Sequence, residues 1–251
     1  MTEKTPERNS AFIICNGVTR KELKYNPHFQ EGKGVHDHEL DVLNQHTTFG
    51  CNALYREWQP SYLISIDEGI TEEIKTSGYN GVHIVPPLEE QYEDSAYHEA
   101  HGHGPHIRQI GGTPRSNAGM NAMSEAIKLG YNFLYIMGMD CIVNDTDMAL
   151  SNLYDKTDNY GPETRASLQD QKARCAYLNW FTYQHPTVHF RFVLPKYAKR
   201  DPVRVGVESF RSDTERRSRQ RMPVSVYSFN GPNVSGMFYD HLIAQLESGV
   251  V

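Results

Sequence analysis

Small and polar residues stand directly after the apolar runs of this chain, where their side chains could reach a bound ligand. Glycine lets the backbone approach a phosphate, and asparagine offers donors and acceptors to a ribose or a base edge. Because parallel strands end at one edge of a sheet, these positions predict a nucleotide site there. Turn formation alone explains an isolated Asn or Gly, but the coincidence at several strand ends favours binding. The residues are Asn16, Gly17, Asn52, Asp67, Gly138, Asp140, Asn230 and Gly231.

Two helix starts would add backbone N–H donors to the same edge. Thr19 and Glu22 fit a capping box, so a short helix is expected to begin at Thr19. Residues 116–120 predict a polar, glycine-containing loop before a helix at 122–129. We therefore assign Thr19 to nucleotide binding, because a helix N-terminus supplies free N–H donors.

Candidate catalytic groups lie in the long polar segments. Tyr154 and Tyr160 could stabilise a leaving phosphate by O–H donation, or simply pack within a loop. Four histidines interleaved with glycines are open to three interpretations: a metal site, a solvated loop, or a lid that supplies a catalytic base. Of these histidines, which are His98, His101, His103 and His106, we take His103 as the candidate base and predict no metal site.

Asp67 has two readings of its own. It follows the apolar run 61–66, where a carboxylate could hold Mg²⁺ on a diphosphate, since magnesium prefers oxygen ligands. The alternative, which we favour, is a helix N-cap or turn aspartate.

The elements that must position these residues alternate between strands and helices. This pattern predicts an α/β, Rossmann-like fold with a mainly parallel sheet and helices on both faces. We expect a flexible tail at 1–10 and one domain at 11–251, with a long loop or lid at about 88–115. Near the end of the chain, the pattern predicts a last strand at 224–229, a turn at 230–233 and a helix at 236–248.

Composition limits the partners. The net charge of −6 over 251 residues argues against broad nucleic-acid binding. No apolar run approaches the roughly 20 residues of a membrane span, and no signal segment is visible, so a cytoplasmic location is expected. Homo-oligomerisation stays open. Four widely spaced cysteines, at positions 15, 51, 141 and 175, indicate buried thiols in a reducing compartment.

Several segments resemble the bacterial lipooligosaccharide sialyltransferases. The sequence ICNGVTRKEL at 14–23 is similar to the strand–NGPSLKEL–helix opening of that family, and FGCNALY at 49–55 to its FRCNQFY segment. The sequence RSNAG at 115–119, followed by AIKLGY and YIMGMD, is similar to its RITSG, AIALGY and IYLSGID series. The opening also resembles the Rossmann-like domain of motility accessory proteins and archaeal hydroxymethylpterin pyrophosphokinases.

This resemblance implies a glycosyltransferase that moves a sugar from a CMP-type donor, its co-substrate, to a glycan acceptor. It places Asn16, Gly17 and Asn52 on the cytidine nucleotide, and Ala118 and Gly119 near the donor. It places Arg115 by the reaction centre. The family's Tyr-Ile-Gly-His motif has no counterpart in residues 142–186.

Two alternatives remain open at this point. One is a Mg²⁺-dependent diphosphotransferase of the pyrophosphokinase-like type, which would use Asp67 and Asp140, so Mg²⁺ is a candidate cofactor. The other is a catalytically inactive relative that binds a nucleotide.

Overall fold

A parallel β-sheet forms the centre of the protein. The computed structural model describes residues 7–25, 38–87, 116–143, 149–195 and 232–251. Seven strands run in the order β4-β3-β2-β1-β5-β6-β7, and each neighbouring pair is parallel. The strands are β1 (Ser10–Ile14), β2 (Thr48–Cys51), β3 (Tyr62–Ile64), β4 (His83–Ile84), β5 (Phe133–Met137), β6 (His189–Leu194) and β7 (Val234–Phe238).

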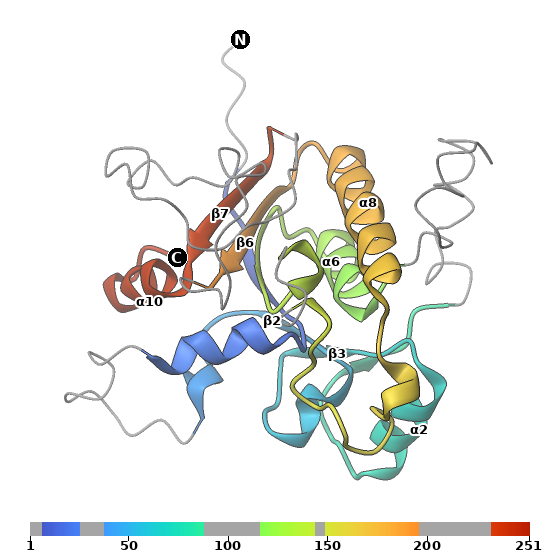
Figure 1. Cartoon of the computed structure of the whole chain (residues 1–251). Helices are drawn as coiled ribbons and strands as arrows, with labels where there is room; N and C mark the ends of the chain where they lie inside the picture. Colours follow the sequence, from blue (N-terminus) through green and yellow to red (C-terminus); the bar gives the residue numbers. More distant parts are fainter. Residues whose placement is uncertain (1–6, 26–37, 88–115, 144–148, 196–231) are drawn as a thin grey trace.

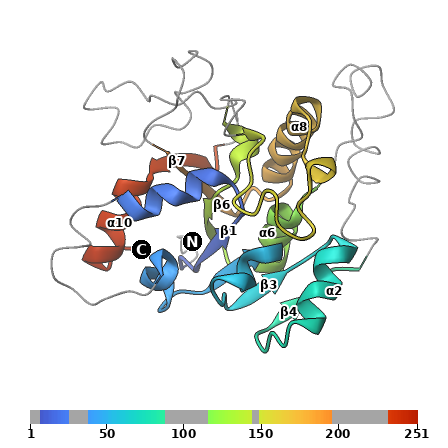
Figure 2. The ribbon, with the colours of Figure 1, turned by 60° about the horizontal axis from the view of Figure 1, so that its bottom comes forward.

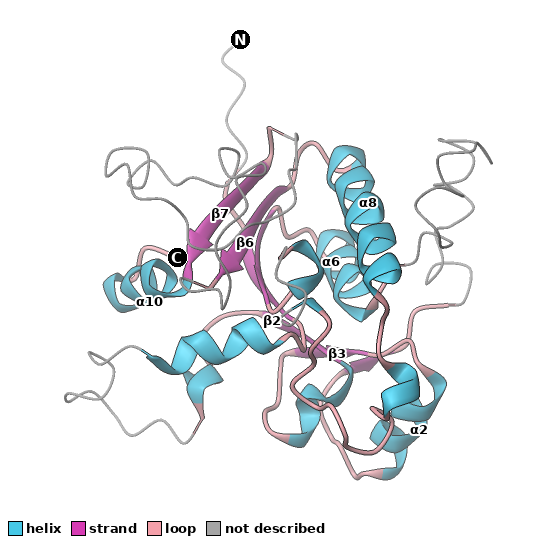
Figure 3. Cartoon of the chain, viewed as in Figure 1, coloured by secondary structure: helices cyan, strands magenta, loops and turns pink. Residues whose placement is uncertain are grey.

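Helices cover both faces of this sheet, which confirms the predicted α/β class (Figure 1). Figure 3 shows α6 and α8 together on one side of the strands, and α10 on the other. The α-helices are α2 (Glu68–Thr76), α6 (Ala118–Lys128), α8 (Leu168–Gln184) and α10 (Tyr239–Ser248). The 3₁₀ helices are η1 (Val18–Tyr25), η2 (Glu39–Leu43), η3 (Asn52–Arg56), η4 (Asp140–Ile142) and η5 (Pro162–Thr164).

The sheet divides the apolar residues into two cores, because alternate residues of a strand point to opposite faces. Ile13 belongs to the core beneath α6 and α8, whereas Phe12 and Ile14 belong to the core beneath η1, α2 and α10. All three side chains are fully buried. A strand buried on both faces needs a continuous apolar run, which is what residues 11–15 supply.

The order of connections reverses at β1. The chain proceeds outward from β1 through β2 and β3 to β4, and then returns to the other side of β1 to form β5, β6 and β7 (Figure 2). Ile14 pairs with Gly50 on β2 and with Met137 on β5, so these three strands end at one level. Such a switch point opens a crevice at the carboxyl ends of the strands.

The end of the chain corrects one prediction. The helix expected at 236–248 begins only at Tyr239, because residues 234–238 form β7. Val234 pairs with Phe190, and Phe238 with Leu194, so pairing with β6 decides the conformation of this segment. The strand expected at 224–229 and the loop expected at 88–115 lie outside the described residues.

Two helix starts also differ from expectation. Helix α6 begins at Ala118, so Ala118 and Gly119 lie in its first turn rather than in a loop. The cause is Asn117, whose side chain accepts the Met120 N–H at 2.9 Å. Helix η1 begins at Val18, and the Thr19 hydroxyl contacts Asp140 instead of capping a helix.

Within the described residues, no helix combines the length and the apolar character that crossing a membrane requires.

Candidate functional site

A cavity of about 650 Å³ opens where β1, β2 and β5 end. This volume lies within the range of small-molecule sites, roughly 300–1,000 Å³. One side of the cavity, the strand-end wall, comprises residues 15–17, 51–52, 66–67, 69–70, 116–119 and 138–141. The opposite side, the loop wall, comprises residues 149–152, Asp155, Asn159, Tyr160, Glu163, Arg165, Ala166, Gln171 and Arg174.

Close backbone packing shapes the strand-end wall. The Gly17 N–H donates to the Gly138 carbonyl at 3.0 Å, which joins the ends of β1 and β5. A Cβ atom on Gly17 would overlap the Asp140 carboxyl group. Gly138 has φ +67°, and a Cβ atom there would lie 2.7 Å from the Cys15 carbonyl oxygen. Glycine is therefore required at both positions.

The Asp140 carboxyl group is turned into the protein. It is 5% exposed and accepts the Thr19 N–H at 3.0 Å and the Thr19 hydroxyl. Burial raises the pKa of Asp140 to about 6, although the hydrogen bonds from Thr19 and Val18 oppose the shift. The carboxylate thus occupies the donors at the start of η1, where sequence reasoning placed a ligand phosphate.

Two amide side chains bring unpaired acceptors to the cavity. Asn16 donates from Nδ2 to the Tyr160 hydroxyl at 3.4 Å, and Asn52 donates to Asp67 Oδ2 at 2.9 Å. These two Asn residues are 9% and 8% exposed, and each Oδ1 atom is buried without a hydrogen-bond partner. A buried, unsatisfied acceptor costs about 1–3 kcal/mol. A ligand with O–H or N–H donors, such as a ribose or an exocyclic amine, would satisfy both.

Asp67 stands at the N-cap position of α2 without capping it. The Thr71 N–H donates to the Asp67 backbone carbonyl at 2.9 Å, while the side chain makes no capping bond. The carboxylate instead accepts the amide of Asn52 and borders the cavity. Across the residues described, no group of three His, Cys, Asp or Glu side chains is placed to hold a metal ion.

The N-terminus of α6 opens onto the same cavity. Ala118 and Gly119 both line it, and the first N–H groups of a helix lack intrahelical partners. A Cβ atom on Gly119 would lie 2.5 Å from Cys15 Sγ, so only glycine lets α6 pack this closely on β1.

The loop wall is attached directly to the end of β1. The Leu153 N–H donates to the Asn16 carbonyl at 2.9 Å, and Gly17 forms a bridge with Asn152. Tyr160 borders the cavity, and burial raises its pKa to about 12, so the phenol stays protonated at neutral pH.

Tyr154, the other tyrosine predicted from the sequence, does not border the cavity. Its side chain is 7% exposed, and its hydroxyl donates to Glu57 at 2.6 Å. Glu57 in turn pairs with the fully buried guanidinium of Arg20. The structure therefore places Tyr154 behind the loop wall, in a supporting network.

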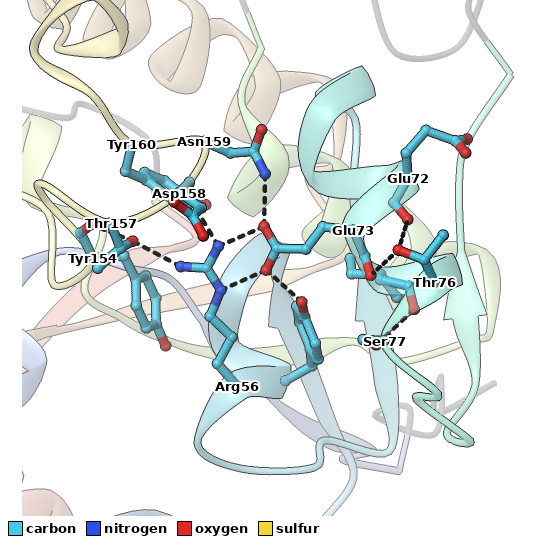
Figure 4. Close-up of polar contacts among 12 residues, drawn as sticks. Arg56, Glu72, Glu73, Thr76, Ser77, Tyr154, Thr157, Asp158, Asn159 and Tyr160 are labelled. Atoms are coloured by element: carbon cyan, nitrogen blue, oxygen red, sulfur yellow. Dashed lines mark hydrogen bonds and ion pairs between the residues drawn. The ribbon is translucent and has the colours of Figure 1, made fainter.

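A second network holds the loop wall in place (Figure 4). Arg56 on η3 makes two hydrogen bonds of 2.6 Å to Glu73 on α2. The same guanidinium donates to the Thr157 hydroxyl at 2.7 Å and to the Asp158 carbonyl at 2.8 Å. Asn159 adds a bond of 2.6 Å to Glu73. These bonds lower the pKa of Glu73 to about 2.

Helix α8 supplies polar groups that sequence reasoning did not assign to the site. Gln171 and Arg174, three residues apart, both line the cavity. Gln171 Nε2 donates to the Ala149 carbonyl at 2.6 Å, whereas its Oε1 atom and Arg174 Nε are buried without partners. The helical period puts these two residues on one face of α8. No sequence signal indicates that this face meets a cavity.

The structure thus brings most of the predicted site residues to one cavity: Asn16, Gly17, Asn52, Asp67, Ala118, Gly119, Gly138, Asp140 and Tyr160. Thr19 lies just behind them, bonded to Asp140. The other predicted positions, Arg115, His103, Asn230 and Gly231, lie outside the described residues. No histidine lines the cavity in the described part of the chain.

Comparison with known proteins gives little. No family model and no curated protein matches the chain. Among solved structures, the chain is similar to a sialyltransferase from Campylobacter jejuni in complex with a substrate analogue, cytidine-5'-monophosphate. The identity is 13%, the match covers 73% of this chain and 79% of that chain, and the TM-score is 0.33.

Proposed function

We propose that this protein is a nucleotide-sugar-dependent glycosyltransferase that binds a CMP-type donor in the cavity at the strand ends. The observation that carries the proposal is the pair of buried acceptors, Asn16 Oδ1 and Asn52 Oδ1, at the switch point of a parallel sheet. Both amides belong to the segments that resemble the sialyltransferases, and a cytidine nucleotide has ribose hydroxyls and an exocyclic amine to satisfy them.

The reaction would proceed by displacement. A general base removes the proton of an acceptor hydroxyl, the oxygen attacks the anomeric carbon of the donor, and the bond to the nucleotide phosphate breaks. Charge then develops on the departing phosphate. Tyr160 is suited to donate a hydrogen bond there, because its hydroxyl oxygen already accepts from Asn16 and its own proton is free to point elsewhere.

The remaining roles rest on the resemblance and on sequence. Arg115 would stabilise the leaving phosphate, and His103 would act as the base, since histidine titrates near neutral pH. Ala118 and Gly119 would support the donor from the first turn of α6.

No observation in the described structure favours the Mg²⁺-dependent diphosphotransferase. That mechanism would need Asp67 and Asp140 to share a cation, but the Asp140 oxygens are engaged by Thr19. Asp67 accepts the amide of Asn52.

Calorimetric titration with CMP, UMP and AMP, each with and without Mg²⁺, tests the binding half of the proposal. We expect CMP to bind without Mg²⁺. Asn16→Ala and Asn52→Gly should each weaken CMP binding about fivefold to tenfold, because each removes one acceptor. Glycine is chosen for position 52 because Asn52 has φ +48°. Asn132→Ala is the control, since Asn132 contacts Glu7 and Asn9 instead.

Absence of CMP binding, or an affinity equal to that of the wild type in both variants, would overturn the proposed site. The transfer half is tested by incubating the protein with a CMP-activated sugar and a panel of glycan acceptors. A donor-dependent mass gain on an acceptor is expected. Binding without any mass gain would leave a nucleotide-binding protein that does not catalyse transfer.

A further inference from the structure

Three cysteines line the cavity. Cys15, Cys51 and Cys141 line it, and all four cysteines of the chain are free and buried. All four belong to the same apolar core, although they are widely separated in sequence. Cys15 and Cys51 are 6% and 2% exposed, and the face they show is toward the cavity.

Sheet register sets Cys15 beside Cys51. Ile14 pairs with Gly50, so the next residue on each strand, Cys15 and Cys51, stands at the neighbouring position. Both side chains enter the core beneath α6 and α8, so they lie on the same face of the sheet. Neighbouring strands are about 4.8 Å apart, and disulfides span Cα separations of about 4.4–6.8 Å.

The other two thiols are arranged differently. The Cys175 thiol donates to the Cys141 carbonyl oxygen at 2.6 Å, and burial together with the neighbouring Cys141 side chain holds its pKa above its ordinary value. In the resting state, the neighbouring Cys51 thiol and burial hold the pKa of Cys15 above its ordinary value. The Cys15 thiol is therefore expected to be protonated at neutral pH.

We propose that Cys15 and Cys51 form a reversible disulfide under oxidising conditions, and that this bond weakens ligand binding in the cavity. Each thiol loses one proton and one electron, and a sulfur–sulfur bond forms. With diamide as the oxidant, the N=N bond takes up the two electrons and two protons and becomes a hydrazine. A dithiol such as dithiothreitol reverses the step by exchange.

The effect on ligand binding follows from the sequence neighbours of the pair. Cys15 precedes Asn16 and Cys51 precedes Asn52, which carry the two unpaired acceptors. A disulfide draws the Cβ atoms to about 3.8 Å, closer than the strand spacing of about 4.8 Å. The strand ends must move together, and the amides move with them. The same strain makes the bond easy to reduce.

Peptide mapping of the full-length protein tests the bond itself. Trypsin separates the four cysteines into four peptides, 9–20, 34–56, 129–156 and 175–191, so every pairing gives its own mass. After diamide treatment we expect peptide 9–20 joined to peptide 34–56, a loss of two hydrogens from the intact mass, and full reversal by dithiothreitol. A bridge to Cys141 or Cys175 instead, or no bridge at diamide levels that oxidise the urea-unfolded chain, would overturn the proposal.

Single variants provide controls. Cys51→Ala should abolish the bridge, whereas Cys175→Ser should leave it intact. Circular dichroism and thermal melting verify that each variant is folded. If Cys51→Ala fails to fold, the peptide map of the wild-type protein alone decides whether the Cys15–Cys51 disulfide forms.

Titration with CMP tests the consequence, which rests on the proposed function. We expect the oxidised protein to bind CMP about tenfold more weakly than the reduced protein, as for the loss of one well-formed hydrogen bond. Equal affinities would overturn this half of the proposal. If the reduced protein does not bind CMP, the proposed function fails, and the peptide map still decides whether the redox pair exists.

Discussion

The two walls of the cavity are built by different means. The strand-end wall follows from sheet topology: β1, β2 and β5 end at one level, and Gly17 and Gly138 let their ends meet. The loop wall contains no strand of the sheet: backbone contacts attach it to the end of β1, and side-chain bonds from Arg56 and Glu73 hold residues 157–159. Changes in the first wall should therefore be felt throughout the fold, and changes in the second chiefly at the site.

Gly138→Ala should cause the largest loss of stability, because it adds a Cβ atom where the ends of β1 and β5 meet. The new Cβ atom would lie 2.7 Å from the Cys15 carbonyl oxygen, and the residue would have to keep φ +67°. Overpacking and left-handed backbone strain together predict a loss of about 4 kcal/mol in the free energy of unfolding. Urea denaturation measures it.

Gly130→Ala is the matched control. Gly130 has φ +88°, but a Cβ atom there has no neighbour within 4 Å. Only the conformational cost of about 1 kcal/mol remains. Equal losses at the two glycines would show that the strand-end junction is not tightly packed.

Two carboxyl groups, Asp140 in the strand-end wall and Glu73 beside the loop wall, should make the stability of the fold depend on pH in opposite directions. Burial raises the pKa of Asp140 from 3.8 to about 6, so its contribution to stability is full below pH 4 and is lost as pH rises to 6. Arg56 lowers the pKa of Glu73 from 4.5 to about 2, so its contribution is present above pH 4.5 and is lost as pH falls toward 2.

Urea denaturation of the wild type, Asp140→Asn and Glu73→Gln between pH 3 and pH 7 would separate the two groups. The free energy of unfolding of the wild type, relative to that of Asp140→Asn, should fall by about 3 kcal/mol as pH rises from 4 to 7. Relative to Glu73→Gln, the free energy of unfolding of the wild type should fall by about 2 kcal/mol as pH falls from 5 to 3. The effect is limited because the Glu73 site is partly solvated. Parallel pH curves for the two variants would contradict this assignment.

Arg56→Ala tests whether the loop wall depends on side-chain bonds. The change removes two bonds to Glu73 and two to residues 157–158, so we expect a loss of about 2 kcal/mol. Hydrogen exchange should accelerate at residues 152–160 and remain unchanged in β1. Lys75→Ala, which breaks an exposed pair with Glu72, is the control and should cost less than about 0.5 kcal/mol. Faster exchange in β1 would show that the walls are not independent.

The two walls also differ in how much of each could be predicted from the sequence. Continuous apolar runs such as 11–15 predict buried strands, and the Asn or Gly after each run falls at the strand ends by topology alone. The placement of Asn16, Gly17 and Asn52 at the strand ends was therefore predictable from the sequence. The orientation of Asp140 toward Thr19 was not, because burial of a carboxylate depends on packing that no local pattern encodes.

The loop wall shows where prediction fails. Its shape depends on contacts between residues far apart in the chain, such as Arg56 with Asp158, and on the face of α8 that Gln171 and Arg174 occupy. The two loop tyrosines looked equivalent in sequence, but only Tyr160 borders the cavity. At the chain end, β7 also went unpredicted at 234–238, because pairing with β6 overrides a weak local signal.

The two tyrosines give the smallest and most specific test. Tyr160→Phe should weaken CMP binding about threefold to tenfold with little loss of stability, because the Asn16 amide loses its acceptor at the edge of the cavity. Tyr154→Phe should lower the free energy of unfolding by about 1 kcal/mol, since Glu57 loses a partly buried hydrogen bond, while the CMP affinity stays unchanged. Calorimetry and urea denaturation on both variants measure the two effects. If Tyr154→Phe weakens CMP binding as much as Tyr160→Phe does, the network behind the loop wall sets the geometry of the site, and the division between a binding wall and its support would have to be abandoned.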